Sequence, residues 1–167
     1  VGLETVKAGT ADSNEQVVGL RFEGVDIPRG AKVVSASIDF TSDDSASTSA
    51  ALLIDAEDSD SAATFAAQPK NITSRTLTGT PIAWEAQPWD KGSIYTSPDL
   101  TPVVTKIVNR KGWCGGSSSL AFVISKADGT PYRLSKTYDN APFFAPTLNV
   151  EYEIKSVPKD TCIQQHY

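Results

Sequence analysis

Histidine and methionine are almost missing from this chain of 167 residues, which has no methionine and one histidine, His166, next to the last residue. A serine or cysteine nucleophile needs a base such as histidine beside it, so the sequence disfavours that kind of hydrolysis. Neither a Gly-x-Ser-x-Gly turn nor a phosphate-binding glycine loop is present. A carboxylate pair for glycoside hydrolysis stays open, although no pair is singled out. We therefore expect a protein that binds or builds, not an enzyme.

Long apolar runs and an excess of basic residues are also absent. No run approaches the roughly 18 apolar residues that a membrane helix needs. The 15 Lys and Arg residues against 20 Asp and Glu residues give a net charge of -5. Nucleic acid is disfavoured as a partner, because neutralising phosphates needs a basic face. Cations, neutral glycans and other copies of the chain remain as partners.

Cysteine is scarce, and its use bears on the compartment. The sequence begins at Val1 without a methionine, which we interpret as a mature chain whose signal has been cleaved. In an oxidising compartment we expect Cys114 and Cys162 to form a disulfide; two buried thiols are the alternative. Asn71 begins an Asn-Ile-Thr sequon, a glycosylation site if the exporting cell modifies such sites. The sequence thus predicts a secreted, extracellular or cell-surface protein.

Alternation of apolar and polar residues is the main structural signal. In residues 32–41, for example, Val34, Ala36, Ile38 and Phe40 share one face, as in a strand with one buried side. Many short antiparallel strands with one buried face pack as two sheets, and jelly roll is the commonest such design near this length. We predict an all-β, jelly-roll-like antiparallel β-sandwich. The expected strands, about eight in number, are 1–7, 16–23, 32–41, 50–57, 80–86, 120–124, 131–137 and 148–154.

One segment departs from strand periodicity. Ser97 and Pro98 are typical of the N-cap and the first position of a helix, and Gly112 is typical of its end. We expect a short amphipathic helix that plugs one end of the core. We expect residues 1–155 to form one domain and 156–167 to be a polar tail, tethered by Cys162. The apolar stripe of the helix comprises Leu100, Val103, Val104, Ile107 and Val108.

A set of motifs is spread along the chain, in residues 18–22, 27–31, 62–65, Trp84, Trp89, 98–100, 107–113, 138–139 and 145–152. The chain resembles a jelly-roll β-sandwich module of secreted and surface proteins of bacteria, including pilus-tip adhesin-like proteins. The resemblance implies fold and export, but this family offers no catalytic motif to carry over. Its jelly-roll relatives are often carbohydrate-binding modules with a structural calcium. The two cysteines and the tail beyond Tyr152 depart from the pattern.

Crowded acids suggest a calcium site. Calcium takes six to eight oxygen ligands from carboxylates and carbonyls. The alternative explanation of the acids between residues 55 and 60 is a solvated acidic rim without a metal. A second site follows from the jelly-roll analogy alone, in which a metal ties the first strand to the last through Glu4 and Asp139. The acids of the first candidate site are Asp55, Glu57, Asp58 and Asp60.

Two functions of different class fit these features. We favour a structural subunit of a self-assembling extracellular filament or surface layer. Residues 1–14 are short and poorly patterned, as expected of a strand that completes its pairing with another chain. The alternative is a carbohydrate-binding or adhesion module that stacks an exposed ring on a sugar. Trp89, in a loop-like setting, is the best candidate for that ring, whereas Trp84 and Trp113 are expected in the core.

Overall fold

The structure, a computed structural model, describes residues 6–8, 17–128, 131–139 and 141–154. These residues form nine strands, one α-helix and two short 3-10 turns, and every strand pairing is antiparallel. The predicted all-β antiparallel sandwich is confirmed. No helix in the described ranges is long and apolar enough to cross a membrane.

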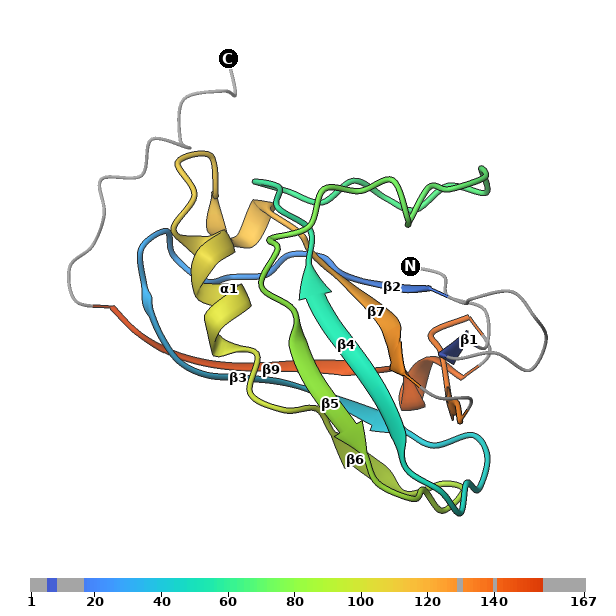
Figure 1. The fold of residues 1–167 in the computed structure, drawn as a ribbon. Coiled ribbons are helices and arrows are strands. Elements are labelled where there is room, and N and C mark those ends of the chain that lie inside the picture. The colour runs from blue at the N-terminus through green and yellow to red at the C-terminus, as the bar shows by residue number, and fades with distance from the viewer. Residues whose placement is uncertain (1–5, 9–16, 129–130, 140, 155–167) are drawn as a thin grey trace.

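Two sheets face each other across the core (Figure 1). The connections from β2 to β3, β3 to β4, β5 to β6 and β6 to β7 each pass from one sheet to the other. Such crossings are typical of Greek-key sandwiches, and the jelly-roll subtype stays a prediction. The four-stranded sheet has the order β2 (Val18–Phe22), β7 (Leu120–Asp128), β4 (Ala50–Ala56), β5 (Ile82–Ala86). The three-stranded sheet has the order β6 (Ile94–Thr96), β3 (Lys32–Thr41), β9 (Thr147–Glu153).

A small ribbon stands apart from these sheets. It pairs β1 (Val6–Ala8) with β8 (Arg133–Ser135). An isolated bridge between Ser42 and Ser135 joins the ribbon to the end of β3.

The alternation predicted for β3 is correct over most of the strand and wrong at its start. Ile38 and Phe40 are buried as expected, but Val34 is 42% exposed and Val33 is buried. The pairing of β3 with β9 is irregular between Val33 and Ser35, where an extra residue enters β3. Such a β-bulge moves the side chains before it to the opposite faces. Simple alternation cannot reveal a single inserted residue.

The predicted helix exists, but it is shorter than expected. Helix α1 (Thr101–Val108) has Leu100, not Ser97, as its N-cap, and it ends at Asn109 rather than Gly112. The hydroxyl of Ser97 instead accepts a hydrogen bond from the N–H of Ile38 at 3.0 Å. Ser97 therefore satisfies a backbone group of β3 instead of capping the helix. The helix packs against β3 and β4 through Val103, Val104, Ile107 and Val108, all of which are buried.

Candidate functional site

Asp55, the first residue of the predicted calcium cluster, is buried inside the hydrogen-bond network of the fold. It lies in β4 and is 5% exposed. Its carboxylate accepts hydrogen bonds from the N–H of Ala56 at 2.7 Å, the N–H of Gly79 at 3.1 Å and the hydroxyl of Thr78. These bonds tie β4 to the segment that leads into β5.

The other three acids of the cluster contact arginines. Glu57 pairs with Arg75 at 2.5 Å. Asp60 and Asp58 both accept from Arg110, the former at 2.7 Å. The hydrogen bond that Arg110 donates to Asp60 is the largest cause of the raised pKa of Arg110. Arg75 and Arg110 therefore provide positive charge that was not anticipated from the acidic stretch, because they lie far from it in the sequence.

A calcium site at either predicted position stays a prediction. Within the described ranges, no group of three or more Asp, Glu, His or Cys residues could hold a metal ion. Of the second pair, Glu4 lies outside the described residues. Asp139 is exposed and follows Tyr138 on the surface.

Trp89 does not lie on the surface, so the prediction of an exposed sugar-stacking ring at this position is wrong. It is 3% exposed and stacks on Tyr95, with ring centres 4.8 Å apart and planes at 8°. The backbone of Trp89 pairs with that of Ala46, which folds this loop inward over the core. Trp84 and Trp113 are buried, as predicted.

The exposed aromatic side chains lie elsewhere, in a segment that we name the aromatic turn: Tyr138, Phe143 and Phe144. Phe143 is 97% exposed, Tyr138 is 55% exposed and Phe144 is 54% exposed. The two phenylalanines lie in the 3-10 turn η2 (Pro142–Phe144), with Pro146 following shortly after. The sequence pattern assigned no role to either phenylalanine. The sequence signal that could have revealed this turn is the pair of phenylalanines between Pro142 and Pro146, because each proline restricts the backbone torsion angle φ.

One lateral side of the sandwich is incompletely covered, and we call it the open side. Here β2 and β9 are the edge strands of the two sheets, and among the described residues β9 pairs only with β3. A groove of about 450 Å³ lies between the end of β2 and β9. Its lining includes the apolar residues Phe22, Val25, Leu148 and Val150, beside the acids Glu23 and Asp26. At one end, the hydroxyl of Tyr152 donates to the carbonyl of Asp26 at 2.9 Å.

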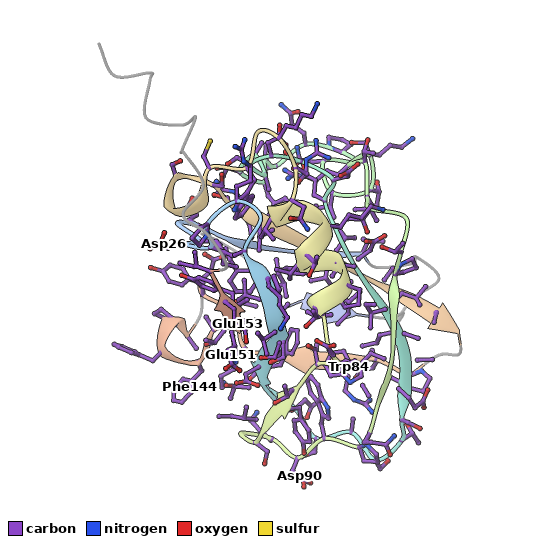
Figure 2. All side chains as sticks on the ribbon, turned by 90° about the vertical axis from the view of Figure 1, so that its left-hand side faces the viewer. Asp26, Trp84, Asp90, Phe144, Glu151 and Glu153 are labelled. Carbon is purple, nitrogen blue, oxygen red and sulfur yellow. The ribbon has the colours of Figure 1, made fainter. Side chains whose placement is uncertain are left out.

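Acidic residues and the aromatic turn border this open side. Figure 2 shows Asp26, Glu153, Glu151 and Phe144 on the same side of the molecule, apart from Trp84. Along β9, side chains alternate between exposed and half-buried. The half-buried members, Leu148, Val150 and Tyr152, pack against the core.

The predicted covalent sites are only partly within the described residues. Cys114 is half-buried at the start of the 3-10 turn η1 (Gly115–Ser117), whereas Cys162 lies outside the described residues, so the disulfide stays a prediction. Asn71 is half-buried, and its side-chain oxygen accepts a hydrogen bond from the N–H of Ala66 at 3.0 Å. Glycosylation of Asn71 also stays a prediction.

No known family, curated protein or solved structure matches this chain. The resemblance to bacterial jelly-roll modules therefore stays a prediction. The open side and the aromatic turn are the surfaces from which a function can be proposed.

Proposed function

We propose that this protein is a non-catalytic structural subunit, which assembles with copies of itself into an extracellular filament or surface layer. The open side carries this proposal. An edge strand presents a row of backbone N–H and C=O groups that can pair with a further strand. The half-buried apolar residues of β9 and the groove beside them add apolar surface that such a contact would cover.

Among the edge strands, β9 offers the longest template. It has seven residues, whereas β2 and β5 have five each and β6 has three. No proline interrupts it, and a proline within an edge strand is a common protection against strand addition. Its exposed acids limit unspecific pairing, and one of them, Glu153, is matched by Lys32 at 3.0 Å. These features favour specific pairing of the β9 edge over nonspecific aggregation.

Negative-stain electron microscopy of the full-length protein, together with light scattering over a range of concentrations, tests the proposal. We expect regular filaments or sheets and a scattering mass that rises with concentration. Dispersed single subunits at every concentration would overturn the structural role.

Carbohydrate binding is a second candidate function, and the aromatic turn favours it. Exposed aromatic rings can stack on the apolar faces of sugars, and three such rings occur in this turn. A glycan array with wild-type protein and with Tyr138→Ala and Phe143→Ala variants tests this candidate. Binding that both substitutions abolish would support it, and wild-type protein that binds no glycan would contradict it.

A further inference from the structure

The direction of the backbone groups of β9 follows from the hydrogen bonds of β3. The carbonyls of Ala36 and Ile38 accept from the N–H groups of Leu100 and Ser97, at 2.8 Å in both cases. Ser97 directly follows β6, which borders β3 on the side opposite β9. Both accepting carbonyls therefore point away from β9. In an antiparallel pair, residues directly opposite each other either both face the partner or both face away.

The alternate residues of β3 must consequently face β9. Ser37 lies opposite Asn149, and Ser35 lies opposite Glu151. The backbone groups of Asn149 and Glu151 are thus used by β3. The backbone groups of the residues between and beside them, Leu148, Val150 and Tyr152, point outward from the sheet.

We infer that this edge pairs with the β9 edge of a second copy, antiparallel and across a two-fold axis at Val150. The inference rests on the proposed self-assembly and names one of its contacts. Strand β9 is self-complementary in this register: Val150 lies opposite itself, and Leu148 lies opposite Tyr152 of the second copy. All three outward residues take part, which gives about six backbone hydrogen bonds.

Neighbouring registers are less favourable. Moving the axis to Asn149 brings Pro146, which lacks an N–H, opposite Tyr152 of the second copy. Moving it to Glu151 places this glutamate directly opposite its own copy, and like charges in that position are destabilising. With the axis at Val150, Glu151 lies opposite Asn149 and Glu153 opposite Thr147, both uncharged partners.

The same register joins apolar surface. Leu148, Val150 and Tyr152 point toward the core and are only half-buried. Across the two-fold axis, Val150 meets Val150, and Leu148 meets Tyr152 of the second copy. The contact would combine two three-stranded sheets into one continuous sheet, which removes the unpaired edge from both copies.

A cysteine pair tests both the contact and its register. Asn149 and Glu151 of the second copy lie opposite each other without mutual backbone hydrogen bonds, the arrangement in which side chains come closest. We would mix Asn149→Cys protein with Glu151→Cys protein, oxidise with copper phenanthroline, and separate the products without reductant. We expect a covalent dimer in the mixture, containing up to about half of the paired copies because association is random. Neither variant alone should show it above the background of wild-type protein, which carries Cys114 and Cys162.

Proline variants provide a second, independent readout. Val150→Pro removes an outward N–H but no hydrogen bond to β3, so it should fold and stay monomeric in light scattering. The matched control is Ala83→Pro in the edge strand β5, an exposed residue opposite Leu53. The N–H of Glu57, just after β4, donates to the carbonyl of Ala121 in β7 at 2.8 Å, so every second residue before it, Leu53 included, faces β7 and the N–H of Ala83 points outward. This control should assemble as the wild-type protein does. If Val150→Pro fails to fold by circular dichroism, the cysteine pair still decides.

The outcomes separate the inference from the proposed function. Assembly of wild-type protein without a covalent dimer in the mixture would overturn the β9 contact and leave the structural role intact. A wild-type protein that never associates would overturn both.

Discussion

At the residue scale, Arg133 is an unusual buried cation. It is 3% exposed, and its guanidinium donates to the carbonyls of Thr48, Ala86 and Gln87 at 2.5 to 2.7 Å. The guanidinium also lies 5.7 Å from the centre of the Trp89 ring. Burial lowers the pKa of Arg133, since no ion pair to a carboxylate accompanies it in the described part of the chain. One side chain thus connects β8, the loop before β4 and the end of β5.

Removing this guanidinium should destabilise the protein. For Arg133→Met we expect a loss of about 2–4 kcal/mol in the free energy of unfolding, because buried carbonyls lose their donor. Urea unfolding followed by tryptophan fluorescence would measure the change. Arg133→Lys keeps the positive charge but has fewer hydrogen-bond donors, so its free energy of unfolding should lie between those of wild-type protein and Arg133→Met. Equal stability of Arg133→Met and wild-type protein would contradict this account.

The charges of the acidic cluster can also be tested at this scale. Arg75 and Arg110 pair with Glu57, Asp58 and Asp60, so the alternative to a calcium site, an acidic rim whose charge needs no metal, predicts that EDTA leaves the melting temperature unchanged. Scanning calorimetry with and without added calcium would measure this. A melting temperature that falls in EDTA and recovers with calcium would establish the calcium site instead.

At the scale of elements, several polar contacts join the β1–β8 ribbon to the sheets, including hydrogen bonds from the N–H groups of Asp43 and Lys136 to the carbonyls of Leu134 and Thr41. One of them is the ion pair between Lys136, just after β8, and Asp43, just after β3, at 2.6 Å. The hydrogen bond from Lys136 is the largest cause that lowers the pKa of Asp43. A carboxyl whose pKa is lower in the folded state stabilises the fold above its unfolded pKa, and this contribution is lost as pH falls through the folded value.

The pH dependence of the Lys136→Met variant follows from that sign. At about pH 6, where Asp43 is charged in both states, the variant should be less stable than wild-type protein. The difference should shrink as the pH falls below about 4, where Asp43 becomes protonated. Urea unfolding at several pH values would show it, with Lys126→Met, on β7, as the control. A difference that stays constant down to about pH 2 would contradict the role of this pair.

The sequence predicted the elements better than their ends and better than the site. Periodicity identified β3, β4 and β9 and the stripe of α1, because each buries one face along its length. Periodicity missed the bulge after Val33, which results from one inserted residue in β3. It also missed the start of α1, where the hydroxyl of Ser97 binds the backbone of β3 instead of capping the helix. Tertiary contacts buried Trp89 and brought Arg110 to the acids. Contacts between residues distant in sequence leave no mark on local patterns.

At the scale of the whole molecule, a two-fold contact at β9 closes on itself. It yields a dimer, and a filament or layer needs a second, different contact. The aromatic turn is the clearest candidate, because Phe143 is 97% exposed and lies in the short 3-10 turn η2. Burying one aromatic side chain contributes roughly 1.5–3 kcal/mol, enough to matter where many copies associate.

Substituting this ring should therefore separate the two steps of assembly. We expect Phe143→Ser, when it is added to the Asn149→Cys and Glu151→Cys proteins, to form dimers that still cross-link through β9. Electron microscopy of Phe143→Ser should show no filaments or sheets. The matched control is Ile94→Ser, which removes another exposed apolar side chain, 67% exposed, from β6. The Ile94→Ser variant should polymerise normally. Losing the Ile94 side chain raises solubility, as losing the Phe143 ring does, but it leaves the aromatic turn intact. Filaments of Phe143→Ser would assign the second contact to another surface. Loss of filaments in both variants would show a general response to lost apolar surface rather than a specific contact at the aromatic turn.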